Sequence, residues 1–176
     1  MKDEIKYIIA AILIAVSFIA GFYVHSFFFS PSIIVSPYHG DEIIGFITSA
    51  EESLDVEVYL ISSTEVIDAL ADAKERGVHV RVIVDAGVYE DGNDWVLERF
   101  AENGIPVKFG NGHNRYHSKF IIKDGEAVIV GSHNLSYSAL YKNREVSIIL
   151  YNILIGEFQE IFEEDWNNGI YPGMML

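Results

Sequence analysis

The sequence contains no cysteine, and this absence excludes several kinds of site before any motif is considered. The 176 residues provide no disulfide, no thiolate ligand for zinc and no cysteine nucleophile. The absence leaves the compartment open, because many extracellular proteins have no disulfides. From residue 30 onward the chain also lacks linkers, low-complexity segments and internal repeats, so we expect one domain there.

Basic residues are scarce as well. The chain has 12 Lys+Arg against 26 Asp+Glu, which gives a formal net charge of -14. Spread evenly, that charge would argue against nucleic acid or an anionic membrane surface as a partner. Apolar residues make up 50% of the chain, so disorder of the whole chain is excluded. The length suits one α/β-sized core rather than two ordinary domains.

Charged residues are missing from one long stretch near the amino terminus. Residues 7–29 contain no Asp, Glu, Lys or Arg, and a run of this length can cross a bilayer. We expect an uncleaved N-terminal membrane anchor over residues 1–29, with a cleaved signal peptide and a buried core helix as the alternatives. Because Lys2 and Lys6 precede the run, the positive-inside rule predicts a cytoplasmic amino end and a domain, residues 30–176, on the extracytoplasmic side.

After the apolar stretch, short β-rich runs alternate with helical patterns. This alternation predicts an α/β layer architecture, with a mixed, largely parallel sheet flanked by helices. The predicted strands are residues 32–36, 54–61, 78–84 and 105–109, and the predicted helices are residues 41–50, 94–103 and 153–168 and one between Ser62 and Gly77.

The segment between Tyr116 and Glu145 carries the most informative pattern. Residues 120–122 and 127–130 are β-rich and flank Asp124-Gly125, a two-residue turn signal. This arrangement predicts a β-hairpin. Gly131 follows the second strand, where the missing side chain lets a backbone or a ligand approach closely.

Four polar side chains are predicted to meet at one end of this hairpin. His117 and Lys119 are two apart on a strand and therefore face the same way, and Ser132 and Asn134 share that spacing after the second strand. Together they suit a phosphate group: an imidazole is a nucleophile or proton donor, an ammonium supplies positive charge, and a hydroxyl and a carboxamide donate hydrogen bonds. A solvated strand followed by a polar turn remains an equal interpretation of the spacing alone.

The same residues resemble the signature of the phospholipase D superfamily, HxKxxxxD followed by GSxN. The strand and helix order from Ser32 to Asn168 also resembles the domain of that family, so a phospholipase D-like domain is expected. The matching positions are His117, Lys119, Asp124, Gly131, Ser132 and Asn134.

The resemblance implies a role for each matched side chain. His117 would be the nucleophile and form a phosphohistidine, while Lys119 and Asn134 would hold the phosphoryl oxygens. Ser132 would lie in the same pocket. Asp124 would be an orienting or structural residue.

The resemblance also implies an acidic residue after GSxN that orients the catalytic imidazole, and Glu145 is the candidate. No metal and no cofactor are expected, because two imidazoles can serve as nucleophile and acid at neutral pH. His113 and His117 are four apart, but no further ligands complete a tetrahedral set around them.

Counting motifs predicts the oligomer. Of six histidines only His117 begins a His-x-Lys motif, whereas the active site of the family needs two such motifs, one histidine attacking phosphorus and the other protonating the leaving oxygen. The resemblance therefore implies a two-fold symmetric homodimer with both His117 side chains near the axis.

The substrate is less sharply defined than the reaction class. One-motif chains of this size resemble small endonucleases and membrane-anchored cardiolipin hydrolases of the mitochondrial type. Residues 108–144 carry six Lys+Arg against two Asp+Glu, which is +4 locally, and aromatic residues are interleaved, as suits single-stranded nucleic acid. We expect an endonuclease on single-stranded or duplex nucleic acid. A hydrolase of phospholipids such as cardiolipin and an inactive membrane-tethered binding module are the alternatives. The aromatic residues are Phe109, Tyr116, Tyr137 and Tyr141.

Overall fold

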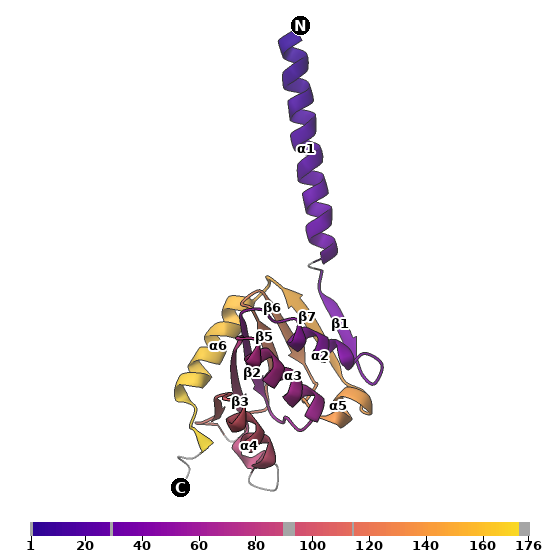
Figure 1. Cartoon of the computed structure of the whole chain (residues 1–176). Helices are drawn as coiled ribbons and strands as arrows, with labels where there is room; N and C mark the ends of the chain where they lie inside the picture. The colour runs from indigo at the N-terminus through magenta and orange to yellow at the C-terminus, as the bar shows by residue number, and fades with distance from the viewer. Residues whose placement is uncertain (1, 29, 90–93, 114, 173–176) are drawn as a thin grey trace. The chain divides into compact units, whose positions relative to one another are not determined.

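The chain forms two compact units, residues 1–31 and residues 32–176. The computed structural model describes residues 2–28, 30–89, 94–113 and 115–172. The first unit is the helix α1 (Lys2–Phe28), and the second is an α/β domain (Figure 1).

Helix α1 is long and apolar enough over Glu4–Val24 to be a candidate membrane span. None of that span is buried within the protein, and the membrane anchor stays a prediction. A helix that is apolar on all sides and exposed along its length is typical of a segment that lies in lipid.

Seven strands form a single mixed sheet. In chain order they are β1 (Ser32–Val35), β2 (Ser53–Val58), β3 (His79–Val84), β4 (Val107–Phe109), β5 (Lys119–Lys123), β6 (Ala127–Gly131) and β7 (Val146–Tyr151). Across the sheet their order is β1-β7-β6-β5-β2-β3-β4.

The predicted α/β class and the mixed sheet flanked by helices are confirmed, but the expectation of a largely parallel sheet is wrong. Only β2 with β3 and β3 with β4 pair in parallel. The other four neighbouring pairs are antiparallel. The physical reason is the hairpin β5–β6: its strands are joined by a tight turn, and β7 and β1 extend the sheet from it in the same alternating manner.

Helices cover both faces of the sheet (Figure 1). The helices of the domain are α2 (Asp41–Thr48), α3 (Thr64–Glu75), α4 (Asp94–Glu102), α5 (Tyr137–Tyr141) and α6 (Ile155–Asn168), with a 3₁₀ turn, η1 (Ala86–Val88). Helices α2, α3 and α4 pack over the larger hydrophobic core, and α6 covers the opposite face, where Phe162 packs with Phe120 and Ile122. The short helix α5 was not predicted; it begins after Ser136, whose Oγ accepts a hydrogen bond from the Ala139 amide at 3.2 Å.

Candidate active site

The predicted hairpin is confirmed, and it sets His117 beside Lys119. Strands β5 and β6 pair antiparallel, with Phe120 opposite Val130. His117 comes just before β5, and Lys119 is its first residue. Lys119 Nζ lies 3.2 Å from His117 Nδ1 and donates a hydrogen bond to the His117 carbonyl oxygen at 2.8 Å. The imidazole and the ammonium therefore form one unit at the start of the strand.

Five of the six predicted site residues lie at the same edge of the sheet. His117 and Lys119 are at the start of β5, Ser132 and Asn134 follow the end of β6, and Glu145 precedes β7. Because β6 pairs antiparallel with both neighbouring strands, these three strand ends meet. The structure thus brings the two halves of the motif together.

Gly131 is the residue that allows β6 and β7 to approach at this edge. A Cβ atom on Gly131 would lie 2.4 Å from the Val146 carbonyl oxygen and 2.4 Å from the Ser147 Cα. Such distances are impossible for carbon, so only glycine fits. The predicted close approach is confirmed, and it is made by backbone.

Glu145 and Ser132 form a direct contact. Ser132 Oγ donates a hydrogen bond to Glu145 Oε2 at 2.5 Å and accepts one from the Val146 amide at 3.0 Å. Asn143 Nδ2 donates to Glu145 Oε1 at 3.3 Å. Both carboxylate oxygens are therefore held by neighbours in the chain, and the orientation of the His117 ring by Glu145 stays a prediction.

Electrostatic effects connect Lys119 to this carboxylate. Partial burial lowers the pKa of Lys119, and the negative charge of Glu145 acts in the opposite direction on the same pKa. Glu145 thus helps to keep the lysine cationic at an edge of the sheet where a phosphate would need that charge.

Asn134 holds a polar atom that the fold leaves unsatisfied. Its side-chain Oδ1 is buried and accepts no hydrogen bond within the part of the chain that the structure describes. Buried amide groups are normally hydrogen-bonded, so this oxygen is available to a donor from outside the chain. If the amide turned over, Nδ2 would offer a donor in the same position.

His133, to which the sequence assigned no role, fixes the loop that carries Ser132 and Asn134. It is buried, with Nε2 2.7 Å from Ser36 Oγ and Nδ1 2.7 Å from Ser147 Oγ. Because Ser36 donates its own proton to a backbone carbonyl, Ser36 accepts from Nε2, which therefore carries a hydrogen. Burial lowers the pKa of His133 and so disfavours a charged ring.

Two further residues at the site were missed from the sequence, Tyr59 and Asp85. The ring centroid of Tyr59 is 4.6 Å from that of His117. Asp85 Oδ2 accepts a hydrogen bond from the Tyr116 amide at 2.6 Å, which fixes the backbone just before His117. Both residues directly follow strands that run parallel, β2 and β3. The carboxyl ends of parallel strands are where ligands usually bind, so that position was the available signal.

The basic residues of the segment 108–144 do not all lie at the site. Lys108 packs over an indole ring of α6, and Lys123 lies at the far end of β5 from the site. Arg115 and Lys119 are the two cations that lie against the Tyr59 ring, at 5.7 Å and 5.4 Å from its centroid. Lys108 and Lys123 therefore do not add to the positive charge at the site, which the segment-wide count of +4 included.

The predicted aromatic residues divide between the core and α5. Phe109 and Tyr116 are buried and belong to the hydrophobic clusters. Tyr137 and Tyr141 lie on α5 with their ring centroids 5.1 Å apart. Among the residues with described coordinates, no group of three or more His, Asp or Glu is placed to hold a metal ion.

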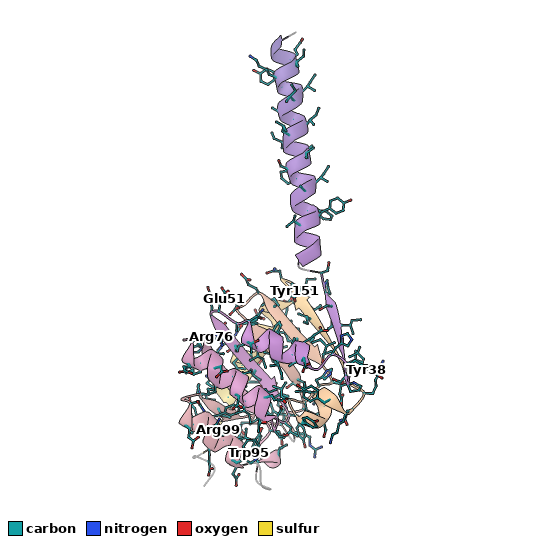
Figure 2. The ribbon with its side chains drawn as sticks, turned by 45° about the vertical axis from the view of Figure 1, so that its right-hand side comes forward. Tyr38, Glu51, Arg76, Trp95, Arg99 and Tyr151 are labelled. Carbon is teal, nitrogen blue, oxygen red and sulfur yellow. The ribbon has the colours of Figure 1, made fainter. Side chains whose placement is uncertain are left out.

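Asp124 lies apart from the other site residues, in the turn between β5 and β6. Its Oδ1 accepts hydrogen bonds from the amides of Glu51, Glu52 and Ser53 at 3.2, 2.7 and 2.9 Å. The Asp124 carboxylate therefore connects the hairpin turn to the loop that enters β2, and we propose a structural role. Figure 2 shows Glu51, which is part of that loop, at one end of the sheet together with Tyr151, and Trp95 at the other end.

Replacement of Asp124 tests that role. Asp124→Ala removes an acceptor shared by three backbone amides and places alanine at a φ of 55°, so we expect it to lower the free energy of unfolding by about 2–4 kcal/mol. Asp124→Asn keeps an oxygen acceptor and tolerates the left-handed backbone, so its loss should be less than half as large. Urea denaturation of the detergent-solubilised chain measures both, and equal losses would contradict the hydrogen-bonding role.

Comparison with known proteins agrees with the motif and the fold. Residues 43–166 match the family model described as "Cardiolipin synthase, PLD-like domain". The chain is 29% identical over 134 residues to a mitochondrial cardiolipin hydrolase of Chlamydomonas reinhardtii, covering 75% of this chain and 59% of that protein. It is 31% identical over 139 residues to a mitochondrial cardiolipin hydrolase of Homo sapiens, covering 73% and 52%. The chain thus spans just over half the length of these curated relatives.

Solved structures give the same result over a larger share of their length. The crystal structure of Nuc, a phospholipase D family member from Salmonella typhimurium, superposes with a TM-score of 0.76 and 28% identity, covering 81% of this chain and 97% of Nuc. NucT from Helicobacter pylori has the same fold, with a TM-score of 0.74 and 22% identity, covering 81% and 99%. With a family model that matches most of the domain, the HxKxxxxD and GSxN residues in place and this fold, the chain belongs to the phospholipase D superfamily.

Proposed function

We propose that the protein hydrolyses phosphodiester bonds of nucleic acid through a phosphohistidine on His117. The observation that carries the proposal is the meeting of His117, Lys119, Ser132 and Asn134 at one edge of the sheet. Imidazole, ammonium, hydroxyl and carboxamide are the groups that a phosphodiester needs for attack, charge neutralisation and hydrogen bonding.

The proposed reaction has two displacement steps. A nitrogen of His117 attacks phosphorus, the bond from phosphorus to the leaving oxygen breaks, and the partner subunit's His117 gives a proton to that oxygen. The same partner imidazole then takes a proton from water, the hydroxide attacks phosphorus, and the phosphorus–nitrogen bond breaks. Lys119 and Asn134 would hold the non-bridging oxygens throughout. Each chain supplies one imidazole, so a homodimer forms one composite site.

The surroundings of His117 favour nucleic acid as the substrate. Arg115 and Lys119 lie on the half-buried Tyr59 ring beside the histidine, and cations next to a partly accessible aromatic ring suit phosphates and bases of a single strand. Phospholipid is the second candidate, supported by the candidate membrane span and by relatives named as cardiolipin hydrolases. Anchored by α1, the domain is proposed to lie on the extracytoplasmic side, because Lys2 and Lys6 precede the span.

Hydrolysis in the absence of metal tests the proposed function. The detergent-solubilised chain should hydrolyse bis(p-nitrophenyl) phosphate in EDTA, and the His117→Asn chain should not. Labelled single-stranded DNA, RNA, duplex DNA and cardiolipin vesicles are then offered in parallel. Turnover of nucleic acid but not of cardiolipin supports the proposal, whereas turnover of cardiolipin alone would identify the protein as a phospholipid hydrolase. No turnover of the chromogenic diester would leave the inactive binding module as the interpretation.

Salt dependence distinguishes binding of a polyanion from binding of a single phosphate. If Arg115 and Lys119 contact two or three phosphates of a strand, kcat/KM should fall roughly 5- to 20-fold between about 50 and about 200 mM salt. Hydrolysis of the chromogenic diester, which has one charge, should change much less and is the control. A flat response for the nucleic acid would contradict phosphate contacts at this site.

A further inference from the structure

A polar cleft of about 350 Å³ opens beside the candidate active site. We call it the strand-end cleft, because the chain segments that follow β2, β3 and β4 form it. Its walls include Tyr59, Asp85, Gly87, Asn111, His113 and Arg115. The volume lies within the range of small-molecule sites.

Tyr59 lines the cleft and also contacts the proposed nucleophile, His117. Its ring contacts His117, with centroids 4.6 Å apart, and it also lies against the guanidinium of Arg115, 5.7 Å from the ring centroid. A phosphate at His117 would therefore have its attached group at the mouth of the cleft. Arg115 is then placed for the next negative charge along a chain of phosphates.

The remaining walls suit a flat polar group rather than an acyl chain. Glycines at positions 87, 110 and 112 leave backbone exposed to the cleft, while Asn111 and His113 offer hydrogen bonds. The Asp85 carboxylate is already engaged, since it accepts from the Gly87 amide at 3.1 Å and from the Tyr116 amide at 2.6 Å. Such a lining would leave the carbons of a fatty acid without apolar partners.

We propose that the strand-end cleft binds the nucleobase attached to the scissile phosphate, with the base stacked on Tyr59 and the next phosphate paired with Arg115. This inference rests on the proposed function and adds to it a subsite for single-stranded nucleic acid. A base held in the cleft is unstacked from its own strand, so a paired duplex is expected to be cleaved more slowly than a single strand.

Small chromogenic esters test the cleft without any variant. The substrates are the p-nitrophenyl esters of thymidine 5′-phosphate and thymidine 3′-phosphate, their counterparts without the base, and methyl p-nitrophenyl phosphate. One of the two thymidine esters should be hydrolysed by the full-length chain with a kcat/KM at least about tenfold higher than its base-free counterpart, as expected for one stacked base.

A variant that fills the cleft provides the second test. Gly87→Leu adds a side chain to the wall, where a Cβ meets only the Asp85 Oδ1 at 3.3 Å. Gly156→Leu is the matched control, since a Cβ at this exposed position of α6 meets nothing within 4 Å. The tenfold preference for the base should disappear in Gly87→Leu and persist in Gly156→Leu.

The possible outcomes distinguish a failure of the proposed nucleobase subsite from a failure of the proposed function. Equal kcat/KM for the esters with and without the base, with all of them hydrolysed, would overturn the cleft and leave the proposed function standing. Hydrolysis of methyl p-nitrophenyl phosphate and cardiolipin, but not of any nucleic acid, would overturn the nucleic-acid function and the cleft together. A preference for the base that Gly87→Leu leaves intact would place the base elsewhere and overturn the cleft alone.

Discussion

Co-expression of equal amounts of wild-type and His117→Asn chains is expected to leave about a quarter of the activity of the same total amount of wild-type chain. If one active site needs two copies of His117, random pairing makes about a quarter of the dimers wild type, and the mixed dimers lack either the nucleophile or the acid. The His117→Asn chain alone should be reduced by at least about 10³-fold.

The measurement uses the dependence of activity on the wild-type fraction. Activity should follow the square of that fraction, whereas independent sites would give a straight line and about half the activity in an equal mixture. His79→Asn is the matched control, because His79 is exposed and lies at the start of β3; co-expressed with wild type, it should reduce nothing. A straight line for His117→Asn would rule out the composite site.

The local pattern around the motif was predictable because each step depends on neighbours in the sequence. The alternation of residues along a strand places His117 beside Lys119, and the Asp124-Gly125 turn determines the hairpin. The family was predictable for the same reason, since the spacing of the motif reflects one hairpin and the strand end that follows it.

The contacts that support the site depend on long-range packing and were not predictable. Tyr59 reaches His117 from β2, and Asp85 reaches the Tyr116 amide from β3, across 31 positions of sequence. The position of both residues after parallel strands indicates a ligand site nearby, but nothing in their local sequence shows which groups they contact. The direction of β2 relative to β5 is equally non-local, which explains why the parallel content of the sheet was overestimated.

Glu57 is the residue whose chemistry conflicts most clearly with its position in the fold, because its ionisable carboxyl group is buried. It lies on β2 beneath the site, is buried, and has one carboxylate oxygen without a partner among the described residues. Its other oxygen accepts a hydrogen bond from Ser118, the residue between His117 and Lys119. Burial raises the pKa of Glu57 to about 7; the hydrogen bond from Ser118 acts against this increase and the charge of Asp165 on α6 adds to it.

The raised pKa of Glu57 predicts a stability that falls as the pH rises. Between about pH 4.5 and pH 7 the folded chain keeps a proton that the unfolded chain has lost, so protons favour folding in this window. Above pH 7 the buried group is ionised and that contribution, about 3 kcal/mol, is gone. Stability from this group is therefore complete below about pH 4.5 and lost through pH 7.

Glu57→Gln should remove this dependence, because the amide resembles the protonated carboxyl group and still accepts from Ser118. We expect the variant to unfold with a free energy up to about 3 kcal/mol higher than wild type at pH 8 and nearly equal to it at pH 4.5. Urea denaturation across this range measures the difference, with the exposed Glu126→Gln as control. Parallel curves for Glu57→Gln and wild type would show that the proton on Glu57 does not stabilise the fold. Ser118, which donates to Glu57, lies between His117 and Lys119. Stability curves of the variant and the wild type that converge at low pH would therefore also mean that the proton on Glu57 stabilises the segment that carries both groups.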